Sequence, residues 1–194
     1  DIVPYQFSNF AETVGRYVSE LKKQLEAMQN QIKERNQEIT EGVFSATSDP
    51  KHPLVPPATE EVPPYLNFAP LDNAVDALSR SADHYDKAAE RISQAFVPPP
   101  QEALKAINGK LMLTERALTH AEGLPGRPWF KHLIYAPGAY TGYGVKTIPG
   151  VREAIELKRW KEAETEIVRV AAALQNEANI IESAARDLDA QPTK

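Results

Sequence analysis

The sequence contains no cysteine and no long apolar run. Without cysteine the chain can form no disulfide, no thiolate metal site and no cysteine nucleophile, although this absence is compatible with any redox compartment. No apolar stretch approaches the ~20 residues that span a bilayer, and the opening DIVPYQF lacks the basic region and apolar core of a signal peptide. We therefore expect no direct contact between this chain and a membrane.

Basic residues are too few and too scattered for a nucleic-acid footprint. The chain has 22 lysines and arginines against 27 aspartates and glutamates, which gives a formal net charge of -5 at pH 7. Binding to phosphates requires a concentrated basic face. We expect no nucleic-acid partner.

Motifs for metal binding and catalysis are also missing. A zinc site needs three or four ligands that come together, but the four histidines lie in separate segments, and no HExxH pair occurs. These histidines are His52, His84, His120 and His132. Neither a phosphate-binding Gly-Lys-Ser/Thr loop nor a GxSxG elbow is present, and the many carboxylates fall mostly on polar helix faces. The sequence therefore predicts no catalytic residue, no metal site and no cofactor within this chain.

Helical periodicity dominates what the sequence does contain. In several segments apolar residues recur three and four positions apart, and each such stripe predicts an amphipathic helix. The predicted helices span roughly residues 7–39, 71–97, 101–121 and 150–188. The second stripe runs to Phe96, before three prolines; the third includes Met112; the last helix is expected to break near Lys158.

The connections between these helices differ in composition. Residues 42–70 hold seven prolines, which predicts an extended surface crossover. Residues 123–149 form one long ordered loop, with at most a very short strand pair near His132 to Tyr135. The fold class is therefore all-α, a four-helix bundle in a single domain of residues 1–194, whose helix order the long crossovers leave open. A helical repeat is the competing layout, but KRWKEAETEI has no second copy at a fixed period.

Aromatic residues near the first helix exceed what its stripe needs. They are Tyr5, Phe7, Phe10, Tyr17 and Tyr65. Most apolar positions are best explained as ordinary core, but an apolar surplus is typical of a domain that binds a partner. An interaction domain is thus one hypothesis from the residues alone.

One specific string of motifs resembles a known family. The run NGKLMLTERALTHAEGLPGRPWFKHLIYAPGAYTGYGVKTIPGVREAI is similar to the C-terminal helical domain of the glutamate carboxypeptidase II and transferrin receptor family, and its longer loop is closer to the carboxypeptidases. Weaker similarity covers essentially the whole chain. The matching residues are Leu111, Met112, Glu115 to Leu118, Gly123 to Pro125, Arg127, Pro128, Lys131, His132, Tyr135 to Pro137 and Ile148 to Gly150.

The resemblance implies a domain cut from a larger protein. Its missing protease-like domain would hold two zinc ions and the catalytic glutamate, so this chain would be noncatalytic alone. The resemblance also implies a two-fold homodimer, and a loop that closes over the substrate pocket. The family's Lys-Tyr pair for a substrate glutamate aligns with Gly142 and Tyr143, so the tyrosine matches and the lysine does not. Arg127 and His132 are expected to brace the loop.

Two alternatives remain beside this interpretation. One is a freestanding helical adaptor whose loop binds a peptide or protein. The other is a helical interaction domain of a catalytically inactive, receptor-like or sorting member of the same family. The sequence gives neither the substrate nor the compartment; a membrane-anchored parent with this domain outside the cytosol is one arrangement that the resemblance allows.

Overall fold

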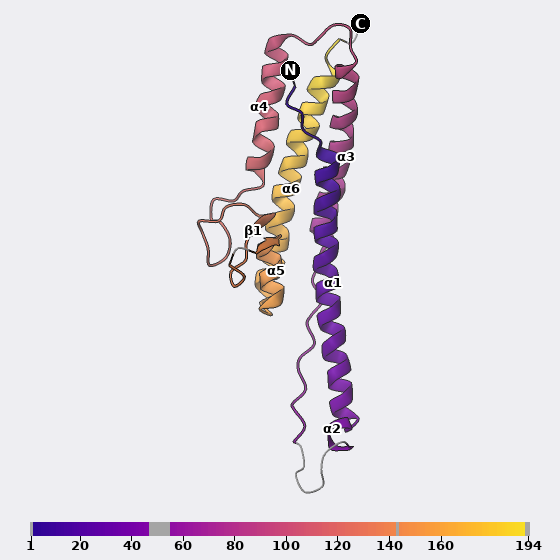
Figure 1. Ribbon diagram of the computed structural model, residues 1–194, viewed down its shortest axis with the longest axis vertical. Coiled ribbons are helices and arrows are strands. Elements are labelled where there is room, and N and C mark those ends of the chain that lie inside the picture. The colour runs from indigo at the N-terminus through magenta and orange to yellow at the C-terminus, as the bar shows by residue number, and fades with distance from the viewer. Residues whose placement is uncertain (1, 47–54, 143, 193–194) are drawn as a thin grey trace.

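The computed structural model describes residues 2–46, 55–142 and 144–192, and the part it describes is mainly helical (Figure 1). In chain order the elements are α1 (Phe7–Thr40), α2 (Val43–Ala46), α3 (Ala69–Ser93), α4 (Gln101–Ala117), β1 (Tyr135–Pro137), β2 (Val145–Thr147), α5 (Pro149–Glu156) and α6 (Trp160–Asp189). No helix of the described residues combines the length and apolar character needed to cross a bilayer.

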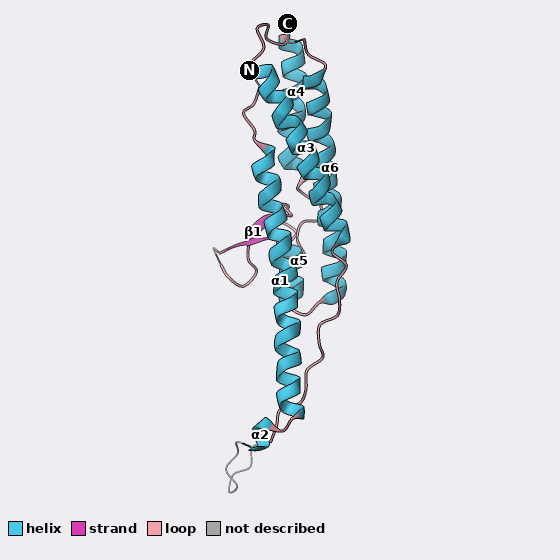
Figure 2. Ribbon diagram, turned by 90° about the vertical axis from the view of Figure 1, so that its right-hand side faces the viewer, coloured by secondary structure: helices cyan, strands magenta, loops and turns pink. Residues whose placement is uncertain are grey.

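The helices α3 and α6 lie side by side at the centre and run in the same direction (Figure 1). Two interactions show that the pairing is parallel. His84 Nδ1 lies 2.9 Å from a Glu182 carboxylate oxygen, and about two turns further along both helices Arg91 Nη2 lies 2.9 Å from Asp189. On either side of this pair, α1 packs on α3 and α4 packs on α6, and both run the opposite way. The short α5 packs against the first turns of α6 (Figure 2).

The core follows the apolar stripes of the central helices. On α3 and α6 the fully buried positions are Leu71, Leu78, Ala82, Tyr85, Ala163, Leu174, Ile181, Ala184, Ala185 and Leu188. A buried Leu or Ile side chain stabilises the fold by roughly 1.5–3 kcal/mol relative to an exposed one. This shared core is the platform on which the smaller elements sit.

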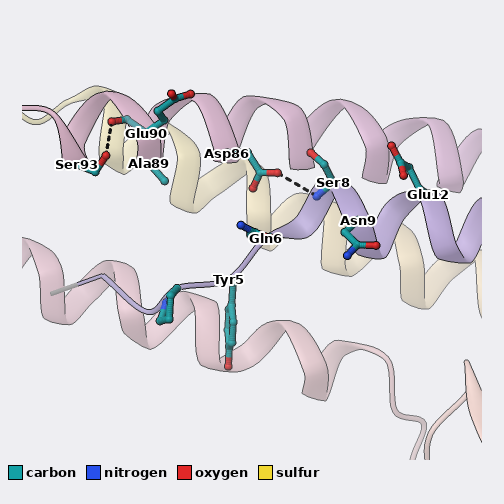
Figure 3. A pocket seen from close by; sticks show the side chains of 10 residues that line it. Tyr5, Gln6, Ser8, Asn9, Glu12, Asp86, Ala89, Glu90 and Ser93 are labelled. Carbon is teal, nitrogen blue, oxygen red and sulfur yellow. Dashed lines mark hydrogen bonds between the residues drawn. The ribbon is translucent and has the colours of Figure 1, made fainter.

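The start of α1 is capped by a side chain from α3. Gln6, at the cap position, makes no capping bond of its own. Instead the Ser8 amide donates to a carboxylate oxygen of Asp86 at 3.1 Å (Figure 3). The Phe7 amide donates to the other oxygen of Asp86 at 3.3 Å, and Ser8 Oγ donates to Asp83 at 3.1 Å. A carboxylate is favourable at the positive end of a helix. These bonds set the register of α1 on α3.

The proline-rich crossover is extended where it is described. After the single turn of α2, residues 55–68 form no helix or strand and run back along α1 (Figure 2). Gln29 Nε2 donates to the carbonyl of Pro63 at 2.9 Å, and Asn36 Nδ2 donates to that of Glu60 at 2.7 Å. Residues 47–54 of the predicted crossover lie outside the described residues.

Two helix ends differ from the sequence prediction. The second helix ends at Ser93 rather than residue 97, and Phe96, assigned to its apolar stripe, is 96% exposed. The cause is Pro98, which has no amide to bond the Gln94 carbonyl four residues earlier and whose ring would clash with that carbonyl in a helix. The third helix ends at Ala117 rather than 121, because the backbone of His120 pairs with Lys131 instead. Met112 of its predicted stripe is 61% exposed.

Other predictions of the fold are confirmed. A mainly helical domain is present, and the last helix breaks near Lys158, whose φ is +56°. One very short antiparallel strand pair joins β1 to β2, with Tyr135 opposite Thr147. The first strand begins at Tyr135, the last residue of the segment His132 to Tyr135 near which the pair was predicted. The four-helix bundle is not established, because α1 and α4 flank the central pair and have at most marginal contact with each other.

Candidate functional site

The loop that carries the recognised motifs is tied to the helices at both ends. The Leu133 amide donates to the Leu118 carbonyl at 2.9 Å, which closes the first half of the loop onto the end of α4. The Ile148 amide donates to the Ile134 carbonyl at 2.6 Å, which closes the second half. Leu124 and the four apolar side chains named above are buried, so the loop has a small core of its own.

A glycine turn shapes the beginning of the loop. Gly123 has a φ of +69°, a region that side chains rarely adopt, and a Cβ built there would lie 2.4 Å from the Pro128 carbonyl oxygen. Gly126 has nearly the same φ but open space around it. Position 123 therefore favours glycine both for its backbone conformation and for the lack of space, whereas position 126 favours glycine only for its backbone conformation.

Arg127 connects three parts of the loop. Its guanidinium donates to the Pro137 carbonyl of β1, and Nη2 lies 2.6 Å from an oxygen of Glu153 on α5. The other oxygen of Glu153 accepts the Ala139 amide at 2.8 Å. Each side chain of the Arg127 and Glu153 pair is only 11% exposed, so the pair is largely desolvated. Sequence reasoning chose the arginine but missed its partner.

His132 lies in a second polar cluster, which we call the Glu115 cluster (Glu115, His132 and Tyr135). The His132 Nδ1 accepts the Ile134 amide at 3.2 Å, so the neutral ring carries its proton on Nε2, 3.1 Å from Glu115 Oε1 but poorly aligned for a hydrogen bond. Tyr135 donates its hydroxyl proton to the same oxygen at 2.6 Å, and its ring stacks on His132 at 4.0 Å between centroids. The cluster joins the strand pair to α4.

Burial and hydrogen bonding fix the charges of this cluster. Burial lowers the pKa of His132, with the neighbouring Glu115 opposing the shift, so the histidine is neutral at pH 7. The bond to Glu115 raises the pKa of the Tyr135 hydroxyl to about 12. The only charge in the cluster is thus the carboxylate of Glu115.

Of the two residues predicted to bind substrate, the structure describes one, Gly142. Gly142 has a φ of +60°, and a Cβ built there would meet no atom within 4 Å. Tyr143 lies outside the described residues. Beside the tip, the Gly138 amide donates to the Gly144 carbonyl at 2.9 Å. The assignment of Gly142 and Tyr143 to substrate binding stays a prediction.

A small polar cavity adjoins the loop. Its volume is about 180 Å³, and its wall includes Arg127, Tyr140, Glu153, Arg159 and Glu162. Sites that enclose a small molecule usually measure ~300–1,000 Å³, so this cavity is too small to surround one on its own. Its mixture of guanidinium, carboxylate and phenol groups can provide hydrogen bonds to one end of a polar ligand.

Close packing of α5 against α6 explains the last motif. A Cβ built on Gly150 would lie 2.3 Å from an oxygen of Glu166, so a larger residue would have to displace that carboxylate. Glu166 is itself buried and pairs with Arg169 at 2.7 Å, and burial raises the pKa of its carboxyl. The preceding Ile148 has a φ of +45°, which a nonglycine residue adopts only under strain. The Ile148 to Gly150 motif thus fixes the entry of the chain into α5.

The structure also shows polar groups that sequence reasoning did not select. Glu153, Glu166 and Glu177 are buried, although they looked like surface carboxylates. A signal existed, because Glu166 and Glu177 lie three residues after the core positions Ala163 and Leu174 and therefore fall on the apolar stripe of α6. Within the described residues, no three His, Cys, Asp or Glu side chains gather as a metal site would require.

Comparison with known proteins identifies related sequences. Residues 66–182 match the transferrin receptor-like dimerisation domain. A probable glutamate carboxypeptidase of Arabidopsis thaliana is 33% identical over 123 residues, which is 60% of this chain and 17% of that protein. A probable glutamate carboxypeptidase of Arthroderma benhamiae is 24% identical over 183 residues, 94% of this chain and 20% of that protein.

A third relative carries a different name. It is an inactive zinc metalloprotease of Schizosaccharomyces pombe, 35% identical over 78 residues, which is 40% of this chain and 10% of that protein. The chain thus spans a fifth or less of the length of these relatives. The family model, in contrast, covers more than half of the chain and includes α3, α4, the loop, α5 and most of α6. The chain belongs to the transferrin receptor-like dimerisation domain family.

Proposed function

We propose that this chain self-associates as a symmetric homodimer and serves as the dimerisation domain of a glutamate carboxypeptidase-like zinc metallopeptidase. The match of residues 66–182 to a dimerisation domain carries the proposal. Exposed apolar side chains support it, because a surface that binds a partner keeps such groups in water until it is covered. On α4 and the strand pair these are Met112, Leu113, Tyr135 and Val145, which are 45–68% exposed.

The four-helix bundle belongs to the same proposal. The two outer helices α1 and α4 each lie against one member of the central pair, and the N-terminal segment connects them, since the Val3 amide donates to Asn108 Oδ1 on α4 at 2.9 Å. This link supports a four-helix arrangement of α1, α3, α4 and α6.

The loop would form one wall of the substrate pocket in the intact protein. Arg127 and His132 would brace that wall through Glu153 and Glu115, and Tyr143 with Gly142 would face the substrate. The size of the adjoining cavity, about 180 Å³, supports a pocket completed by another domain. Zinc and the catalytic groups would belong to that missing protease-like domain, and this chain would be noncatalytic alone.

Light scattering over a wide concentration range tests the dimer. We expect the mass to approach twice the 21.5 kDa of the chain, since a specific interface buries at least ~1,000 Å² in total. A mass that stays at that of one chain at every concentration contradicts dimerisation by this domain.

Steady-state kinetics of the intact protein test the loop. A phenol that donates to a substrate carboxylate contributes about 1.5–3 kcal/mol, in ground and transition state alike. We therefore expect Tyr143→Phe to raise KM about tenfold or more with little change in kcat. The matched control is Tyr65→Phe, at a tyrosine of the crossover before α3 that is 82% exposed. Equal KM values for the two variants would contradict the assignment.

A second candidate is an interaction domain of a catalytically inactive, receptor-like or sorting protein. The similarity to an inactive zinc metalloprotease favours it. The two candidates differ in the parent: hydrolysis of acidic dipeptides by the intact protein supports the first, and its absence together with preserved dimerisation supports the second.

A further inference from the structure

An open cavity between three helices lies away from the loop tip. Its volume is about 330 Å³, within the range of ligand sites. The N-terminal segment and α1 contribute Tyr5, Gln6, Phe7 and Phe10 to its wall, and α4 and α6 contribute Thr114, Glu115 and Glu177. We call it the Glu177 cavity.

The carboxyl of Glu177 is the unusual group in this wall. The residue is only 3% exposed, and its Oε2 has no hydrogen-bond partner. A buried carboxyl oxygen without a partner is costly, so native structures rarely keep one without a ligand or a functional reason. The neighbouring Thr114 does not satisfy it, because its hydroxyl donates to the Leu111 carbonyl at 2.8 Å.

A second carboxylate faces the same space and is held in place. Glu115 receives the Tyr135 hydroxyl at 2.6 Å, with the neutral His132 ring behind it. Because Tyr135 and His132 are neutral, they do not compensate the negative charge of Glu115. That charge lies close enough to Glu177 to raise the pKa of Glu177.

Aromatic rings complete the cavity wall. Tyr5 and Phe7 meet edge to face at 5.6 Å between centroids, and Phe7 meets the buried ring of Tyr85 in the same way at 5.0 Å. Carboxylates beside aromatic rings recognise organic cations, because the rings attract the spread positive charge and the carboxylates accept its hydrogen bonds.

We propose that the Glu177 cavity binds one organic cation, a guanidinium or primary ammonium group, which pairs with Glu177 and Glu115 between the rings of Tyr5, Phe7 and Phe10. A metal ion fits less well, because no group of three ligating side chains is present among the described residues. The cation is either a free small molecule or a basic side chain of a second copy of this chain.

Binding of a cation should change the protonation of Glu177. Burial, with help from Glu115, raises the pKa of Glu177 to about 8, so the empty cavity holds the neutral acid at pH 7. The groups around it are Glu115 on α4, His132 and Tyr135 behind Glu115, Tyr5, and the uncharged phenylalanines of α1. A bound cation favours the carboxylate, so binding releases a proton at pH 7 and strengthens as the pH rises from about 6 to 9.

Calorimetric titration of the 194-residue chain with n-butylguanidinium tests this inference. We expect a Kd on the order of 1 mM at pH 8. Glu177→Gln keeps the shape of the side chain and should weaken binding about tenfold or more. Phe10→Leu should weaken it less, and Glu164→Gln, an exposed carboxylate of α6, should leave it unchanged.

The neutral isostere n-butylurea should bind at least about tenfold more weakly than the cation. Equal binding of cation and urea, equal binding by the Glu177→Gln variant, or no binding of the cation at 50 mM, roughly fifty times the expected Kd, would overturn the proposal.

Light scattering with saturating probe separates the two sources of the cation. A dimer that dissociates as the probe binds identifies a basic side chain of a second copy, and an unchanged mass identifies a free small molecule. The titration measures binding to each chain and the light scattering measures its mass, so a chain that stays monomeric and still binds the probe contradicts the proposed function and supports the Glu177 cavity.

Discussion

The central helices and the motif-bearing loop are stabilised in different ways. On α3 and α6 most buried positions are aliphatic and repeat with the helical period, with Glu166 and Glu177 as the charged-type exceptions. In the loop, by contrast, buried guanidinium, carboxylate and carbonyl groups pair with one another over short distances. Aliphatic packing tolerates exchange among similar residues, whereas paired polar groups depend on each partner. Substitutions in the loop should therefore show sharper residue-specific effects than conservative changes in the core.

The largest expected effect is at Arg127. Its replacement by alanine leaves Glu153 and the Pro137 carbonyl buried without a partner, which should lower the free energy of unfolding by about 3–5 kcal/mol. The matched control is Arg186→Ala, which removes a pair whose arginine is 74% exposed and should cost less than about 1 kcal/mol. Urea unfolding of both variants gives the comparison. Similar costs for the two would mean that the loop pair is not desolvated.

The next effect separates a close backbone approach from backbone conformation. Gly123→Ala adds overpacking against the Pro128 and Phe130 carbonyls to a left-handed φ, and should lower the free energy of unfolding by about 3 kcal/mol. Gly126→Ala has the same φ without the overpacking and should cost about 1 kcal/mol. Thermal and urea unfolding measure both. A result in which Gly126→Ala costs as much as Gly123→Ala would remove the close approach from the explanation.

The third prediction concerns a polar group within the apolar region. Burial raises the pKa of Glu177 in the folded chain to about 8, from 4.5 for an ordinary glutamate carboxyl. An acid whose pKa is raised by folding contributes stability that is present below the unfolded value and is lost as the pH rises toward the folded value. Between pH 4.5 and 8 the native chain should therefore lose stability relative to Glu177→Gln, by on the order of 2 kcal/mol or more. A difference in free energy of unfolding between the two proteins that stays the same from pH 4.5 to 8 would contradict this.

The sequence predicted the long helices because their apolar stripes are continuous. It failed at the ends of α3 and α4, because the predicted helices continue to residues 97 and 121 whereas the observed ones end at Ser93 and Ala117. Pro98 stops α3, and pairing of His120 with Lys131 stops α4. A periodic pattern predicts which face of a helix a residue occupies. It does not predict the residue at which the backbone leaves the helix to form other hydrogen bonds.

The site was predictable only in part. The family motifs pointed to Arg127, His132 and the Ile148 to Gly150 turn, and the structure gives each of them a specific contact. Of their partners, Glu166 falls on the apolar stripe of α6, which was a signal of its burial. Glu153 and Glu115 could not be chosen as partners, because a carboxylate on a helix looks the same in sequence whether it faces water or a buried polar group. For Glu153, its position in the short α5 gave no stripe long enough to assign a buried face.

Amide hydrogen exchange tests the contrast between core and loop most directly. The amides of Leu133 and Ile148 donate to the carbonyls of Leu118 and Ile134, and no regular helix protects them. If the polar pairs hold the loop on the core, both amides exchange slowly in the native chain. In Arg127→Ala their protection then falls by more than that of core amides such as Leu174 and Ile181. Exchange of Leu133 and Ile148 in the native chain at the rate of an unstructured peptide would contradict the account.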